Sequence, residues 1–134
     1  MRFLLYSRGR EETIRRLQSA IAAVAPPDQV EVYSSTVGLQ EALQWGTSHL
    51  AAVVLCVSSA EDLEEILAMG DWLLDLRTIL LLPDREVSTF TLGLALRPRF
   101  ISYLDTDLSD VSAVVARMVA VHQEESAACR RQGD

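Results

Sequence analysis

The chain has 134 residues and a formal net charge of −7, and all 12 of its Lys+Arg residues are arginine. The absence of lysine excludes a Schiff-base lysine, a lysine general base and the P-loop lysine that holds nucleotide phosphates. An acidic chain repels the phosphate backbone, so no nucleic-acid partner is expected. Two cysteines make no disulfide framework, and no apolar run is long enough to span a membrane. We therefore expect a soluble, cytoplasmic protein with one main domain.

Short apolar runs alternate with helical periodicities along the chain. Five segments are predicted to be strands: residues 3–6, 30–34, 50–57, 78–82 and 100–104. Residues 3–6 and 50–57 are apolar runs typical of buried strands, whereas residues 30–34 alternate and predict a half-exposed strand. After each run, apolar residues recur every three or four positions, which predicts helices over about residues 14–24, 36–45, 60–74, 85–96 and 109–122. The remaining polar residues, 123–134, are expected to form a frayed or disordered tail after a domain of residues 1–122.

Four helices carry specific predictions about their ends or faces. Ser59 stands three residues before Asp62, which suits a helix N-cap followed by a carboxylate in the positive first turn. Ser35 or Thr36 can cap the second helix in the same way. In the fourth helix, apolar residues share one side that we expect to face the sheet: Val87, Phe90 and Leu94. The last helix should bury Val111, Val114, Val115, Met118 and Val119.

The order strand–helix, repeated five times, predicts an α/β fold. Strands separated by helices of about 10–15 residues form a parallel sheet covered on both faces, which gives three layers, α/β/α. Five strands in one domain favour the doubly wound, flavodoxin-like order 2-1-3-4-5. Ligands of such sheets bind at the carboxyl ends of the strands. We therefore expect any site near Ser7, Ser58, Pro83 and Asp105.

Residues 1–122 resemble the receiver domain of bacterial two-component response regulators. The most specific local match is Gly38–Leu43 (GLQEAL), where receivers carry a glycine and then an acidic residue, alanine and leucine before the central strand. The resemblance implies a CheY-like fold and a role in two-component signalling.

The receiver chemistry is missing from the matching positions. A receiver needs an acidic pair that holds Mg²⁺, a phosphoaccepting Asp, a Thr or Ser, and a lysine. In the same order, this chain has Ser7 and Arg8, Val57, Leu82 and Tyr103. A shift by one residue would place Cys56 at the phosphoacceptor position, where a core-facing thiol is inert. The resemblance therefore implies a degenerate pseudo-receiver that is not an enzyme and cannot be phosphorylated.

A second hypothesis assigns a small ligand to the vacated pocket. Arg8 and Arg10, with the nearby Ser58 and Ser59, can bind an anion through guanidinium, hydroxyl and amide groups. The alternative is a solvated basic loop. Flavodoxins bind FMN with a hydroxyl-rich loop at this place, and this loop lacks that pattern, so no cofactor is expected.

Three acidic residues at the same edge form a candidate cation site. Asp84, Asp105 and Asp107 could together hold a cation. Two of them suit turns or helix caps, so no metal is expected.

The last predictions concern a protein partner. Phe100 lies where receivers carry a switch aromatic residue, although a core phenylalanine on a strand is the alternative. Leu92 and Val121 lie off the inward sides of the fourth and last helices and could extend an apolar surface patch. Receivers often dimerise or bind effectors through the face formed by the fourth helix, the fifth strand and the last helix. We expect a non-catalytic signalling module with a protein partner, or a second copy, on that face.

Overall fold

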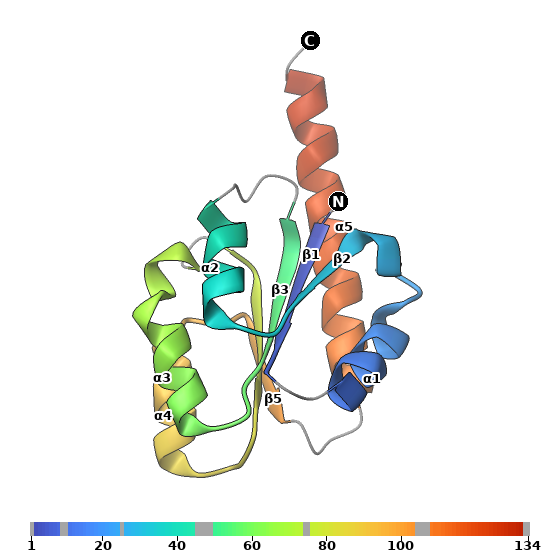
Figure 1. The fold of residues 1–134 in the computed structure, drawn as a ribbon. Coiled ribbons are helices and arrows are strands. Elements are labelled where there is room, and N and C mark those ends of the chain that lie inside the picture. Colours follow the sequence, from blue (N-terminus) through green and yellow to red (C-terminus); the bar gives the residue numbers. More distant parts are fainter. Residues whose placement is uncertain are drawn as a thin grey trace.

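The computed structural model describes residues 2–8, 11–24, 26–44, 50–73, 76–103 and 108–132 (Figure 1). Its centre is a parallel sheet of five strands: β1 (Arg2–Ser7), β2 (Val30–Tyr33), β3 (Leu50–Cys56), β4 (Thr78–Leu82) and β5 (Phe100–Tyr103). The strand order is β2-β1-β3-β4-β5. The predicted class, topology and order of elements are therefore confirmed.

Helices cover both faces of this sheet (Figure 1). They are α1 (Glu11–Ile21), α2 (Thr36–Gln44), α3 (Ala60–Ala68), α4 (Val87–Leu94) and α5 (Ser109–Gln132), with short 3-10 helices η1 (Pro27–Gln29) and η2 (Gly70–Trp72). Alternate residues of each strand belong to opposite cores, because successive side chains point to opposite faces. Phe3 and Leu5 pack on the side of α1 and α5, whereas Leu4 and Tyr6 pack on the side of α2, α3 and α4.

The ends of two helices follow the capping predictions. The Ser59 hydroxyl caps α3 by accepting a hydrogen bond from the Asp62 amide. Ser35 rather than Thr36 caps α2, since its hydroxyl accepts from the Gly38 amide at 3.1 Å. Satisfying these amides fixes where each helix begins.

The last helix is longer than expected. We predicted a frayed or disordered tail after residue 122, but α5 continues as a helix to Gln132. The added residues include Ala, Glu, Gln and Arg, which are strong helix formers. At about 1.5 Å per residue, the helix extends well past the sheet (Figure 1). The boundary between domain and tail at residue 122 stays a prediction. The inward face of α5 is as predicted, with Val111, Val115, Met118 and Val119 buried and Val114 packed against them.

The face that α4 turns to the sheet was predicted wrongly. Val87, Phe90 and Leu94 are 80%, 37% and 51% exposed. The buried residues of α4 are instead the small Thr89 and Gly93. We call the three exposed residues the α4 stripe.

Close packing explains the orientation of α4. A Cβ atom added to Gly93 would lie 2.8 Å from Leu80 Cδ2, so a side chain at this position would force Leu80 or the helix to shift. Leu92, which we expected to extend a surface patch, is partly buried and packs against the core on this side of the sheet. The distance between helix and strand is thus set by the smallest residue at the contact, and the large residues are displaced outward.

No helix among the residues that the structure describes is both long and apolar enough to cross a membrane.

Candidate functional site at the carboxyl edge of the sheet

The positions that would hold receiver chemistry do meet at one edge of the sheet. Ser7 is paired with Cys56 across β1 and β3, and Leu82 is paired with Tyr103 across β4 and β5. Val57 follows directly, and its amide donates to the Leu81 carbonyl at 2.9 Å. These strand ends therefore share one edge of the sheet, whereas their assignment to receiver positions stays a prediction.

No nucleophile replaces the phosphoaccepting carboxylate on β3. The side chain of Val57 is 0% exposed and lies in the core on the side of α2, α3 and α4. The neighbouring Cys56 points to the opposite core, and burial raises the pKa of its thiol far above the ordinary value. A neutral, buried thiol is a weak nucleophile, so neither residue offers reactive chemistry to this edge.

A buried carboxylate from α3 occupies the edge instead. Asp62 is only 1% exposed, and the Tyr6 hydroxyl donates to its Oδ1 at 2.5 Å. Its Oδ2 accepts from the Ser58 amide at 3.1 Å and from the Ser58 hydroxyl at 3.2 Å. Hydrogen bonds to a carboxylate are stronger than those between neutral groups, and they offset the cost of burying its charge. Burial and the Asp62 carboxylate both raise the pKa of Tyr6, which keeps the phenol neutral and donating.

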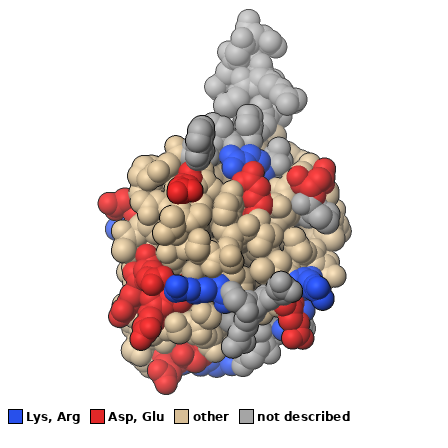
Figure 2. All heavy atoms as spheres, viewed as in Figure 1, with Lys and Arg blue, Asp and Glu red and all other residues tan. Residues whose placement is uncertain are grey.

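The guanidinium of Arg8 supplies the positive charge next to this carboxylate. Arg8 Nη1 lies 2.9 Å from Glu65 Oε2 and 3.8 Å from Asp62 Oδ1. Arg8 and Glu65 are about half exposed, so their own pair is screened by water and contributes little stability. Figure 2 shows acidic side chains gathered over α3 with a basic side chain beside them. Arg8 thus lies beside two carboxylates at the carboxyl edge of the sheet.

At the end of β5, an aromatic residue lies against an arginine. The Arg85 guanidinium lies 4.4 Å from the centroid of the Tyr103 ring, a cation–π contact. Phe100, at the other end of β5, is partly buried and packs against the core on the side of α1 and α5. Its role as a switch residue stays a prediction.

The residues predicted to bind an anion are engaged with neighbours. Arg8 faces two carboxylates, the Ser58 hydroxyl donates to Asp62, and the Ser59 hydroxyl accepts from the Asp62 amide at 3.2 Å. Arg10 lies outside the described residues. An anion would have to break these contacts, so the geometry does not favour the hypothesis, which stays a prediction.

The acidic cluster considered for a cation cannot be assembled from the described residues. Asp105 and Asp107 lie outside them, whereas Asp84 caps a turn by accepting from the Glu86 amide at 3.0 Å. Within the described ranges, no three His, Cys, Asp or Glu residues are arranged to hold a metal ion.

The sequence interpretation missed the burial of Asp62 and its contact with Tyr6. The capping pattern placed Asp62 in the first turn of a helix but gave no sign that the carboxylate is enclosed. The available signal was the alternation in β1, which puts Tyr6 on the same face as Leu4 and hence toward α3. Glu65 and Arg85 carried no distinguishing signal.

Comparisons with known proteins address the fold. No protein-family model and no curated protein matches the chain. Among solved structures, a two-component response regulator from Legionella pneumophila superposes with a TM-score of 0.64 at 14% identity, covering 92% of this chain and 99% of that one. The phosphorylated cyanobacterial phytochrome response regulator RcpA superposes with a TM-score of 0.61 at 15% identity, covering 85% and 88%. The chain therefore has the fold of a response-regulator receiver domain, as the resemblance in sequence predicted.

Proposed function

We propose that this protein is a receiver-like signalling module that is not phosphorylated, is not an enzyme and acts through protein–protein contact. The observation that carries this proposal is the buried Val57 at the phosphoacceptor position, in a fold shared with response-regulator receivers. An apolar side chain with no exposed surface can neither attack a phosphoryl group nor bind Mg²⁺.

The neighbouring charges also oppose phosphoryl transfer. Each oxygen of Asp62 already accepts a hydrogen bond, and Arg8 supplies its counter-charge. A carboxylate held in this way is neither free to attack nor open to a metal. The tyrosine at the lysine position offers no compact cation for a phosphoryl group, because a phenol stays neutral near pH 7.

Incubation with Mg²⁺ and acetyl phosphate tests the first part of the proposal. Intact-mass spectrometry should show an unchanged chain, while a receiver domain that has its phosphoaccepting Asp, added to the same reaction, gains one phosphoryl group. A phosphoryl adduct on any carboxylate of this chain would overturn the proposal. Loss of that adduct in Asp62→Asn would identify Asp62 as the acceptor.

The α4 stripe supports a contact with a protein. Val87, Phe90 and Leu94 lie at positions one, four and eight of α4, so they share one side of the helix and are all exposed. On α5, Val121 is exposed as well. Contiguous exposed apolar surface on a soluble protein commonly marks an interaction site. We propose the α4-β5-α5 face, with the α4 stripe at its centre, as the surface for a protein partner or a second copy.

Introducing negative charge on α4 tests this surface. Phe90→Glu with Leu94→Glu should abolish concentration-dependent self-association in sedimentation velocity and leave the melting temperature nearly unchanged, since both side chains are exposed. The control, Ser88→Glu with Thr91→Glu, adds the same charge at other exposed positions of α4. Equal association in both variants would exclude the stripe from the interface. A monomer at every concentration would exclude a homodimer and leave a different protein as the partner.

A further inference from the structure

Three arginines that are far apart in the sequence meet in one cleft. Arg77, Arg99 and Arg117 line a cavity of about 420 Å³ whose other walls include Phe100, Met118 and Val121. We call it the arginine cleft. It lies near the amino ends of β4 and β5, away from the carboxyl edge described above.

The register of the sheet brings two of these arginines together. Arg77 directly precedes β4 and Arg99 directly precedes β5, and the two strands are parallel neighbours. The Arg99 amide donates to the Thr78 carbonyl at 2.8 Å, which fixes the start of β5 beside the start of β4. Basic residues at equivalent places on adjacent parallel strands therefore become spatial neighbours.

The third arginine comes from α5 together with the apolar lining. Arg117, Met118 and Val121 lie within four positions of one another, so they share one side of the helix. Met118 is buried against the core, whereas Val121 is 42% exposed. This side of α5 therefore offers an apolar surface with a guanidinium at its border.

The charge environment of Arg99 and Arg117 differs from that of Arg8 at the carboxyl edge. Between described residues, Arg2 and Arg8 form ion pairs with carboxylates, but neither Arg99 nor Arg117 does. This concentration of positive charge lies on a chain of net charge −7. Guanidinium groups match carboxylate and phosphate oxygens in geometry as well as in charge.

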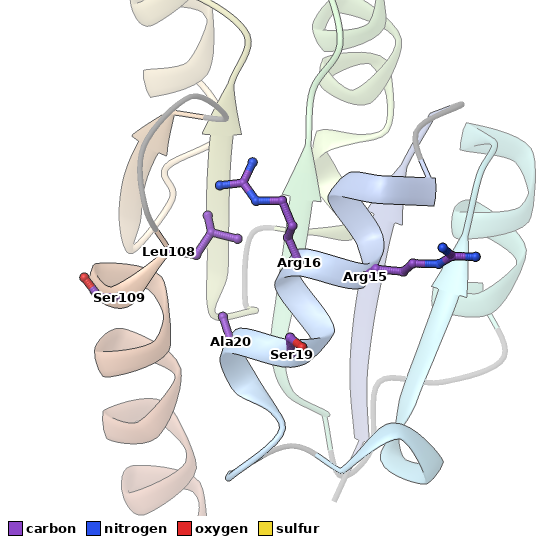
Figure 3. A pocket seen from close by; sticks show the side chains of 6 residues that line it. All are labelled: Arg15, Arg16, Ser19, Ala20, Leu108 and Ser109. Carbon is purple, nitrogen blue, oxygen red and sulfur yellow. The ribbon is translucent and has the colours of Figure 1, made fainter.

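A second cavity with two arginines lacks this convergence. It measures about 550 Å³ and lies between α1 and the start of α5. Figure 3 shows that Arg16 points toward Leu108, whereas Arg15 points to the other side of α1. Their guanidiniums cannot hold one anion between them, so we build no site there.

We propose that the arginine cleft binds a small organic anion, in which a carboxylate or phosphate is joined to an apolar body. The arginines require the negative charge, and the lining of Phe100, Met118 and Val121 requires the apolar part. The volume falls within the range of small-molecule sites, roughly 300–1,000 Å³. This inference does not require the proposed signalling function, although Val121 lines the cleft and also belongs to the proposed α4-β5-α5 face.

Calorimetric titration with three probes tests the ligand class. Decanoate joins both features, decanol keeps the chain without the charge, and acetate keeps the charge without the chain. Decanoate should bind at one site and at least tenfold more tightly than the other two. Equal binding of decanol would reduce the cleft to a nonspecific apolar surface, and equal binding of acetate would reduce it to a nonspecific cationic surface. Either result would overturn the proposal.

Matched arginine variants test the location. Arg99→Gln with Arg117→Gln should weaken decanoate about tenfold, since an exposed ion pair contributes up to roughly fivefold in affinity. Arg15→Gln with Arg16→Gln removes the same charge from the other cavity and should leave decanoate binding unchanged. Both arginines of the first variant are exposed, so circular dichroism should show an intact fold. Equal affinities of the two variants for decanoate would refute the site.

Discussion

The buried hydroxyl of Tyr6 allows a sharp test of the Asp62 network. Tyr6→Phe keeps the ring in the core and removes only the hydrogen bond to Asp62 Oδ1. A hydrogen bond to a charged group stabilises a fold by about 1.5–3 kcal/mol. The other oxygen of Asp62 keeps both bonds from Ser58. We therefore expect the free energy of unfolding to fall by about 2 kcal/mol, which for a domain of this size lowers the melting temperature by roughly 8 °C.

The matched control is Tyr33→Phe. The Tyr33 hydroxyl also donates to a carboxylate, Glu31 Oε2 at 3.0 Å, but this pair is only partly buried. Water can replace the lost bond there, so we expect a loss below about 1 kcal/mol. Urea unfolding of the two variants and the unmodified chain, followed by circular dichroism at pH 7, gives the comparison. Equal losses in both variants would refute the argument that burial makes the Tyr6 bond strong.

The raised pKa of Tyr6 also predicts how the free energy of unfolding depends on alkaline pH. The pKa of Tyr6 is raised in the folded state by burial first and by Asp62 second. A group with a raised folded pKa contributes stability that is fully present below its unfolded pKa, about 10, and is lost as pH rises above it. The unmodified chain should lose stability above about pH 10 more steeply than Tyr6→Phe. The raised pKa of Cys56 acts in both chains and cancels in the difference. Parallel alkaline curves would contradict a buried, carboxylate-bound phenol.

Three further substitutions test local features of the fold. Ser59→Ala should lower the free energy of unfolding by about 1 kcal/mol in chemical denaturation, because the Asp62 amide loses its cap. An unchanged free energy would show that Ser59 has no capping role. Gly93→Ala should lower it by about 1–2 kcal/mol, since a methyl group 2.8 Å from Leu80 Cδ2 overpacks the core by more than the gain in helix propensity; a rise in melting temperature would show that α4 moves outward freely. Arg97→Gly should raise the free energy of unfolding by up to about 1 kcal/mol, because Arg97 has a φ of 52°, which glycine adopts without strain. A lower melting temperature would refute this.

The fold could be predicted from the sequence because its signals are local and repeat five times. β3 and β4 are apolar runs, β2 alternates as a half-exposed strand does, and helical periods between the strands leave a parallel, doubly covered sheet. β3 illustrates this, since it is apolar throughout and buried at every position. The grouping of residues at the carboxyl edge could be predicted as well, because the carboxyl ends of parallel strands must share an edge.

The face of α4 could not be predicted, because hydrophobic periodicity measures which side of a helix is apolar and not how closely it packs. Gly93 and Thr89 have little apolar surface, so hydrophobic periodicity does not mark them as buried. Their small size is what allows α4 to approach Leu80. The same limit hid the arginine cleft, since Arg77 and Arg99 are 22 positions apart in the sequence and become neighbours only through strand pairing.

The two edges of the sheet differ in how their arginines are paired with carboxylates, and this difference affects where an anionic ligand can bind. At the carboxyl edge, the half-exposed Arg8 lies beside the carboxylates of Glu65 and Asp62. At the amino edge, Arg99 and Arg117 face an open cavity. β4 connects this cleft to α4, because Arg77 starts the strand and Leu80, within it, contacts Gly93. If decanoate changes the affinity of a partner for the α4 stripe, thermodynamic linkage requires the partner to change the affinity for decanoate by the same factor. Measuring both factors therefore distinguishes a coupled pair of sites from two independent ones.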